Sequence, residues 1–217
     1  IWRFHGAMPD DPEEMLARAY GLRDPQEARA LYRDWASTYD ATMLDGLGYQ
    51  TPMRAAALLA SHLVERDCPV LDVGAGTGLA GEAPAGHGVT GVGGVDFFPE
   101  MLAVAISRGV YRAAIEADLN RLLPVSDDSY GALVSTGTFT HSHVDAGCLP
   151  ELFRILRRGG LFACTVHRDV WRHCGFEEMT SHLASQSVLE TVLREEGTYY
   201  RGSVAPEGYY CIWRRVR

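Results

Sequence analysis

The chain has 217 residues, 47% of them hydrophobic, and a formal net charge of −8 at pH 7. This length and apolar content suit one packed unit, and the negative charge disfavours nucleic acid or an anionic membrane as a partner. The five cysteines include no C-x-x-C pair, which indicates reduced thiols and a cytoplasmic protein. No stretch reaches the roughly 18 uninterrupted apolar residues of a membrane span, so we expect no membrane insertion.

Two helices are predicted near the N-terminus, because the pairs Asp11-Pro12 and Asp24-Pro25 each place a capping acid before a proline. The second helix has one apolar face rich in aromatic residues, made of Ala28, Leu31, Tyr32, Trp35, Ala36 and Tyr39. That face must pack against another part of the chain. A third helix follows Pro52.

From residue 69 onward, apolar runs of strand length alternate with helical patterns, which predicts a parallel sheet with helices on both faces. The expected strands lie near 69–73, 92–96, 112–117, 131–136 and 161–167. The expected helices after the first strands include 99–108 and 148–157. The sequence therefore predicts an α/β fold with a doubly wound, mostly parallel sheet.

The C-terminal part departs from this alternation. A helix is predicted around 176–196, followed by β-rich runs at 198–205 and 208–216 that a short turn at 206–208 separates. This hairpin would add an antiparallel last strand and bring the sheet to seven strands.

A glycine-rich loop follows the first predicted strand, in the sequence LDVGAGTGL at 71–79. Such a loop lies at the carboxyl end of a strand, where open α/β sheets bind their ligands. A dinucleotide fingerprint aligned on Gly74 and Gly76 would need glycine or alanine where Leu79 stands. A phosphate-binding loop would need G-K-S/T, which does not follow.

The pattern Asp72-x-Gly74-x-Gly76-x-Gly78 resembles the loop of the class I S-adenosylmethionine-dependent methyltransferases. The resemblance extends to Asp96 and Asp118 at the ends of the second and third predicted strands, and to later landmarks such as 156–160. It implies a Rossmann-like fold, S-adenosyl-L-methionine as cofactor, a helical cap over residues 1–50 and a methyltransferase domain over 51–217. The implied cofactor-binding residues are Asp72, Gly74, Ala75, Gly76, Gly78, Asp96, Phe97, Met101, Asp118, Leu119 and Tyr39.

The chemistry of that cofactor suits these residue types. A carboxylate such as Asp96 accepts hydrogen bonds from two ribose hydroxyls, and a second such as Asp118 accepts from an exocyclic amine. The aromatic face of Tyr39 attracts a sulfonium cation. Each residue also has an alternative role, because the two acids are common in turns, and Tyr39 and Met101 also suit a packed core.

Four positions depart from the family pattern, and all concern the scaffold. Pro84 is expected to kink or shorten the helix after the glycine loop. Phe98 stands where a small polar residue usually caps the next helix. Gly131 stands where the family commonly has Asp, and Arg158 replaces a usual proline.

The loop after the fourth strand faces the transferred methyl group in this family, and it contains His141 and His143; His167 ends the fifth strand. These three histidines are the candidate catalytic residues, for positioning an acceptor or accepting its proton. Each one alone is also a common surface residue. The spacing of His141 and His143 lacks a third ligand, so no metal is predicted.

We expect a small-molecule methyl acceptor, because only the N-terminal helices and short loops are left to form a substrate site. The sequence leaves open the acceptor atom, O, N, S or C, and the oligomeric state. Three alternatives have other activities: a nicotinamide-dependent oxidoreductase, an aminopropyl transferase, and a non-catalytic module that binds the cofactor or stabilises a partner.

Overall fold

The computed structural model describes residues 11–22, 25–65, 68–86, 89, 91–109, 111–140 and 144–217. One seven-stranded sheet has the order β3-β2-β1-β4-β5-β7-β6. The strands are β1 Val70–Val73, β2 Val92–Asp96, β3 Ala113–Glu116, β4 Tyr130–Phe139, β5 Leu156–His167, β6 Leu189–Gly197 and β7 Gly208–Arg215. β7 pairs antiparallel with both of its neighbours, β5 and β6, and the other strand pairs are parallel. The predicted Rossmann-like sheet with an antiparallel last strand is therefore confirmed.

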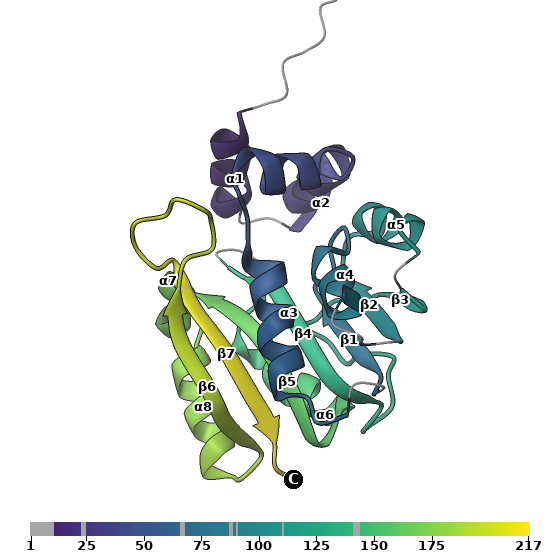
Figure 1. Cartoon of the computed structure of the whole chain (residues 1–217), viewed down its shortest axis with the longest axis vertical. Helices are drawn as coiled ribbons and strands as arrows, with labels where there is room; N and C mark the ends of the chain where they lie inside the picture. The colour runs from purple at the N-terminus through teal and green to yellow at the C-terminus, as the bar shows by residue number, and fades with distance from the viewer. Residues whose placement is uncertain are drawn as a thin grey trace, which may run out of the picture.

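Helices cover both faces of this sheet (Figure 1). Leu71 and Leu133 pack in one core with α6 (Leu149–Ile155) and α8 (Phe176–Ser185). Val70 and Val134 point to the opposite face, where they pack with α3 (Thr51–His62) and α4 (Leu79–Gly86). Successive residues of a strand point to opposite faces, so buried strands without polar alternation require this double cover. Two further helices are α5 (Pro99–Ser107) and α7 (Arg168–His173).

The predicted helix over 176–196 is wrong in its second half. Helix α8 ends at Ser185, and residues 189–197 form the edge strand β6. The charged segment has residues of good helix propensity, but β7 is buried and needs a hydrogen-bonded neighbour on its outer side. Pairing with β7 therefore makes residues 189–197 a strand and not a helix. An ion pair between Glu190 and Arg214 of β7, at 2.8 Å, adds to this pairing.

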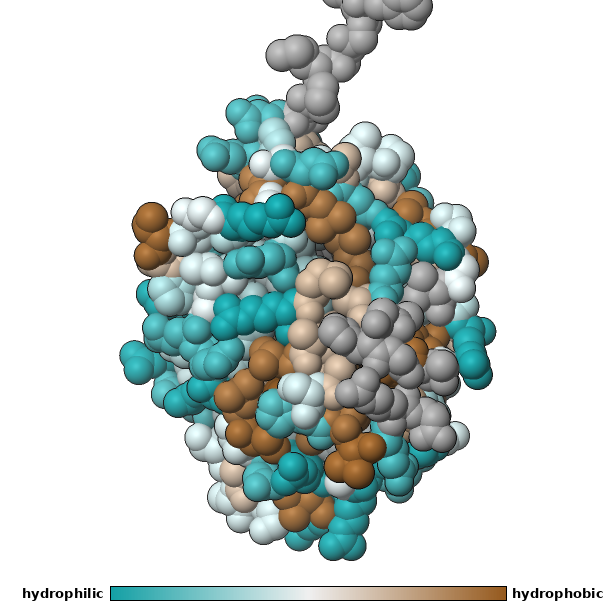
Figure 2. Space-filling view, viewed as in Figure 1, coloured by the Kyte–Doolittle hydropathy of each residue, from teal (hydrophilic) through white to brown (hydrophobic). Residues whose placement is uncertain are grey.

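The predicted strand over 198–205 is also wrong, because this segment is a loop between β6 and β7. The hairpin therefore exists with a longer connection than the turn at 206–208. Hydrophilic residues dominate the surface over β6 (Figure 2), where Glu190, Arg194, Glu195 and Glu196 lie. Charges on an edge strand oppose unwanted pairing with other strands.

The N-terminal helices lie beyond the carboxyl edge of the sheet (Figure 1). They are α1 (Pro12–Gly21), α2 (Pro25–Trp35) and a short π-helix η1 (Ala41–Gly46), which the sequence analysis did not predict. The Asp11 carboxylate accepts the backbone N–H of Glu13 at 2.9 Å, as expected of a cap. Asp24, the predicted second cap, lies outside the described residues.

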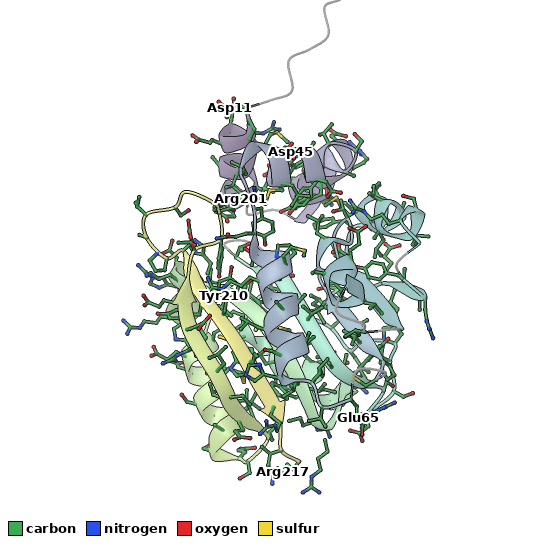
Figure 3. The ribbon with its side chains drawn as sticks, in the orientation of Figure 1. Asp11, Asp45, Glu65, Arg201, Tyr210 and Arg217 are labelled. Atoms are coloured by element: carbon green, nitrogen blue, oxygen red, sulfur yellow. The ribbon has the colours of Figure 1, made fainter. Side chains whose placement is uncertain are left out.

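The loop after β6 supports these helices. Tyr49 bridges to Tyr200, and the Gln50 N–H donates to the Tyr199 carbonyl at 2.9 Å. Figure 3 shows Asp45 and Arg201 at this junction, where both line one surface hollow. We use "cap" below for residues 11–50 as far as they are described.

The departures from the family pattern have local explanations. Helix α4 is only eight residues long, which agrees with an early end near Pro84. At Gly131 a Cβ atom would lie 2.5 Å from the Cβ of Cys68, so a larger residue does not fit. The Arg158 guanidinium donates to the Val216 carbonyl at 2.8 Å and so joins β5 to the end of β7. None of the helices in the described ranges combines the length and apolarity that a bilayer crossing requires.

Candidate active site

A cavity of about 210 Å³ lies at the carboxyl ends of β1, β2 and β4, under the cap. Eight of the predicted cofactor residues line it: Tyr39, Gly74, Gly76, Asp96, Phe97, Met101, Asp118 and Leu119. The sequence analysis did not assign the other lining residues: Ala28, Tyr32, Phe98, Asn120, Thr136, Gly137, Thr138, Thr140 and Val144. Asp72, Ala75 and Gly78 are not part of this lining.

The glycine loop joins β1 to α4 and approaches the end of β4 closely. Gly74 has φ +70°, and a Cβ atom there would lie 2.1 Å from the Thr138 hydroxyl oxygen. The N–H groups of Gly74 and Ala75 both donate to the Val95 carbonyl, at 2.9 and 3.0 Å. Gly78 packs against Ala105 of α5. The loop is thus held against both neighbouring strands, and Gly74 and Gly76 form its cavity side.

Asp96 ends β2 and connects the glycine loop to α5. Its carboxylate accepts the Gly76 N–H at 2.7 Å and the Phe98 N–H at 2.8 Å. The second bond fixes the backbone of Phe98, the N-cap residue of α5, whose side chain supplies no cap. Burial raises the pKa of Asp96, and the backbone N–H donors oppose that rise. The carboxylate still has unused lone pairs, which the cavity makes available to a ligand.

Asp118 follows β3 on the other side of the cavity. Its carboxylate accepts the Asn120 N–H at 2.9 Å and pairs with Arg121 at 3.4 Å. Its side chain remains 32% exposed, so it faces the cavity with less burial than Asp96. Leu119 and Met101 add apolar surface between the two acids, since both are buried and line the cavity.

Asp72 lies behind the loop instead of in the cavity. It is fully buried, accepts the Tyr111 hydroxyl at 2.5 Å, and has no hydrogen bond on its other oxygen. Burial raises the pKa of Asp72 to about 7, while the hydrogen bond from Tyr111 lowers it and the charge of Asp96 raises it. The sequence analysis treated Asp72 as a ligand contact; in the structure its carboxylate bonds to Tyr111 and is not part of the cavity lining.

The raised pKa of Asp72 predicts a pH-dependent stability. Between about pH 4 and pH 7 the folded protein keeps a proton that the unfolded chain loses, so the wild type loses stability as the pH rises through this window. Asp72→Asn has no carboxyl group to titrate, so it does not lose this stability. The difference in unfolding free energy between the variant and the wild type should therefore be more than about 1 kcal/mol larger, in favour of the variant, at pH 8 than at pH 5. Urea unfolding at both pH values measures the difference. A pH-independent difference would contradict the prediction.

The cap closes the cavity with aromatic side chains. The rings of Tyr32 and Phe98 lie 4.7 Å apart, and Trp35 packs edge-on to Tyr39 at 4.8 Å. Arg29 stacks over Phe97 at 4.9 Å. The apolar helix face found in the sequence therefore packs as expected, and Tyr32 and Tyr39 also reach the cavity. Burial raises the pKa of Tyr39 well above its ordinary value, so its hydroxyl stays protonated.

Of the three predicted catalytic histidines, only His167 lies within the described residues. His141 and His143 lie outside the part of the chain that the structure describes, directly after the lining residue Thr140. His167 is off the cavity, where its Nδ1 accepts the Asp169 N–H at 3.2 Å at the start of α7. Its ring also packs edge-on to Tyr20 at 5.9 Å. A catalytic role of His167 stays a prediction.

A polar cluster joins the cap to the glycine loop. Asp40, which precedes η1, accepts the Thr77 hydroxyl at 2.5 Å with one oxygen and pairs with Arg108 through the other. Arg108 also pairs with Glu82 of α4 at 2.9 Å. The side chains of Asp40 and Arg108 are only 25% and 21% exposed. Sequence spacing gave no signal of this cluster, because its members come from distant segments.

Comparisons with known proteins agree with this geometry. Residues 71–164 match the methyltransferase domain family. The chain is 28% identical to human methyltransferase-like protein 27 over 208 residues, which cover 92% of this chain and 78% of that protein.

Two solved structures illustrate the shared fold. The N1-methyltransferase for 1,6-didemethyltoxoflavin from Burkholderia thailandensis, solved with that compound and S-adenosylhomocysteine, has a TM-score of 0.62 at 22% identity, covering 90% of this chain and 92% of its own. An S-adenosylmethionine-dependent methyltransferase from Mesorhizobium loti has a TM-score of 0.58 at 18% identity, covering 73% and 96%.

The domain match, the human relative and the shared fold support a class I S-adenosylmethionine-dependent methyltransferase with S-adenosyl-L-methionine as its cofactor.

The residues of the cavity fit that cofactor. Asp96 keeps free lone pairs at a buried position, Asp118 is a second carboxylate across the cavity, and the aromatic Tyr39 supplies a face for a cation. A ligand can approach the backbone of the glycine loop closely at Gly76, because the nearest atom to a Cβ placed there would be the Met101 methyl carbon at 3.8 Å.

The cluster around Asp40 predicts an effect on cofactor affinity from outside the cavity. Asp40→Asn removes the charge that holds Thr77 and Arg108, so the glycine loop becomes less ordered, and cofactor affinity should fall about tenfold. Calorimetric titration with S-adenosylhomocysteine measures the change. Asp34→Asn is the matched control, because Asp34 forms an ion pair with its neighbour Arg33 and its side chain is 72% exposed. Equal affinity in both variants would contradict the prediction.

Proposed function

We propose that this methyltransferase acts on a small organic acceptor that enters the cavity under the cap. The observation that carries the proposal is the enclosure of the cavity, since Tyr32 and Tyr39 cover it from one side and Thr138 and Gly74 bound it on the other. A narrow space of this kind admits a small molecule more readily than a folded macromolecule. The net charge of −8 also disfavours a nucleic acid acceptor.

We propose two units, an N-terminal helical unit over residues 1–50, which contains the cap, and a methyltransferase domain over 51–217. Asp96 and Asp118 would hold the ribose hydroxyls and the adenine amine of the cofactor, and Gly74 and Gly76 would bring backbone close to it. The bound cofactor supplies an electrophilic methyl group on a sulfonium. A cytoplasmic location belongs to the same proposal and is supported by the five cysteines, which are all free thiols.

The chain's own contribution to the reaction is alignment. Methyl transfer is an in-line displacement, which needs the acceptor held directly behind the methyl carbon. Tyr39, Gly137 and Thr140 lie where the cap meets the end of β4, and they would position the acceptor there. The aromatic rings of Tyr32 and Phe98, 4.7 Å apart, would shield the reacting atoms from water. His141 and His143 remain candidates for accepting a proton from a hydroxyl or amine acceptor.

Parallel titrations with S-adenosylmethionine, S-adenosylhomocysteine and NAD test the cofactor site, and a screen of small molecules with methyl-labelled cofactor tests the acceptor. We expect one-site binding of the two sulfur compounds, no binding of NAD, and label in a small-molecule product. Label found only in protein or RNA would overturn the proposed acceptor class. Cofactor binding with no transfer to any acceptor would favour the non-catalytic module.

A further inference from the structure

A second, smaller hollow adjoins the cofactor cavity beneath the cap. It holds about 30 Å³ and shares Tyr32, Tyr39, Gly137 and Thr140 with the larger cavity. Because these residues form a common wall at the end of β4, a molecule in the smaller hollow would face the ligand in the larger one. This volume suits no more than one or two water molecules. A larger occupant must therefore displace side chains of the wall as it enters.

The wall of the hollow is aromatic and uncharged. It includes six tyrosines from four segments of the chain, and none of the described residues that line it carries a formal charge: Tyr20, Tyr32, Tyr39, Tyr49, Tyr199 and Tyr200. The rings of Tyr49 and Tyr200 lie 5.5 Å apart, and the hydroxyls of Tyr20 and Tyr200 lie 3.2 Å apart. Such a wall offers flat apolar surfaces and a few neutral hydrogen-bonding groups.

The tyrosine hydroxyls keep their protons at neutral pH. Burial raises the pKa of Tyr20, Tyr49 and Tyr200 above the ordinary value. These side chains therefore donate or accept hydrogen bonds but do not act as bases. The described part of the wall likewise provides no carboxylate for that purpose.

This chemistry discriminates among acceptors. A carboxylate or phosphate would lose its hydration, and the described wall offers no cation or N–H-rich side chain to replace it, which leaves the cofactor sulfonium as its one charged neighbour among the groups considered. An aliphatic amine enters as an ammonium ion, which aromatic faces attract, but it must lose a proton before its lone pair becomes a nucleophile. An uncharged aromatic ring stacks on the tyrosines without losing the hydration of a charge and without having to release a proton first.

We propose that the acceptor is an uncharged, flat heteroaromatic molecule whose ring nitrogen receives the methyl group among these tyrosines. The inference rests on the proposed function above. The nitrogen lone pair forms the bond to the methyl carbon, the carbon–sulfur bond breaks, and its electron pair stays on sulfur. The positive charge moves to the ring, which releases an N–H proton to water where it has one. The step needs no base from the protein.

Matched acceptors with labelled cofactor test this proposal. Nicotinamide and isoquinoline present an uncharged ring nitrogen at pH 8, nicotinate has the same ring nitrogen with a carboxylate, and cyclohexylamine is an aliphatic ammonium. We expect transfer to at least one of the two neutral rings, at least tenfold faster than to nicotinate or cyclohexylamine. Equal or faster transfer to a charged acceptor overturns the proposal, as does the absence of transfer to both neutral rings.

A tyrosine variant tests the location. Tyr200→Leu removes a ring and a hydroxyl from the wall, so the acceptor KM should rise about tenfold while the Kd for S-adenosylhomocysteine stays within about twofold. The control is Tyr209→Leu, because Tyr209 packs against Trp171 and lines neither cavity. Unchanged acceptor KM in Tyr200→Leu overturns the location. If the wild-type protein does not bind the cofactor, the proposed function itself is wrong. If it binds the cofactor but methylates the charged acceptors at least as fast as the neutral rings, only this inference is wrong.

Discussion

Replacing Asp96 by alanine should weaken the binding of S-adenosylhomocysteine by about 100-fold or more. The carboxylate faces the cavity and also holds Gly76 and Phe98 through their N–H groups, at 2.7 and 2.8 Å. Charge-assisted hydrogen bonds are worth about 1.5–3 kcal/mol each. The variant loses the hydrogen bonds between Asp96 and the ligand, and its glycine loop becomes less ordered, and together these effects account for a change of about 100-fold in affinity. Calorimetric titration measures the affinity, and thermal unfolding shows whether the variant remains folded.

Two further variants separate the contribution of the Asp96 charge from the general effect of removing a carboxylate from the protein. Asp96→Asn keeps a hydrogen-bond acceptor but removes the charge, and it should bind with an affinity between those of wild type and Asp96→Ala. Asp127→Ala removes a carboxylate that is 71% exposed and pairs with Arg154, and it should bind normally. Wild-type affinity in a folded Asp96→Ala variant would show that Asp96 is not a cofactor residue.

The second large effect is expected from Gly76→Val. Gly76 has φ +52°, which valine rarely adopts, and the new side chain would occupy the cavity near Met101. We expect the variant to fold with a reduced melting temperature and to lose measurable cofactor binding. Calorimetric titration and thermal unfolding, made on the same preparation, check both parts.

Gly159→Val separates backbone strain from blockage of the cavity. Gly159 also has a positive φ, +79°, and a Cβ atom there would meet no atom within 4 Å. This variant should show a similar loss of thermal stability and wild-type cofactor affinity. If Gly159→Val weakened binding as much as Gly76→Val, the effect would come from general destabilisation and not from the site.

The sequence predicted best the features that depend on local patterns. Asp11-Pro12 marked the start of α1, and β2 appeared at the residues expected. The strand β6 was missed because its charged residues suit a helix, and only the need of β7 for a neighbour decides otherwise. Propensity is a local signal, whereas strand pairing depends on residues that are distant in the sequence.

The same distinction holds in the candidate site. The glycine loop and Asp96 have a fixed spacing, and the resemblance identified them without a structure. The structure was needed to show that Asp72 bonds to Tyr111 and does not line the cavity. The sequence gives the type and spacing of the acidic residues, but it does not show toward which neighbours their side chains point. It was also needed to bring Tyr20 to Tyr200, since these tyrosines are 180 residues apart.

The support of the cap by the loop after β6 has a consequence for the order of folding. The Arg201 N–H donates to the Gly48 carbonyl and the Gln50 N–H to the Tyr199 carbonyl, each at 2.9 Å. On the ribosome, residues 199–201 emerge long after the segment that they contact, so Tyr49 waits without its partner Tyr200 until the hairpin of β6 and β7 is made. The wall of the smaller hollow that Tyr199 and Tyr200 complete is therefore the last part of the cap region to form, and a nascent chain that stalls before β6 leaves Tyr49 accessible to chaperones.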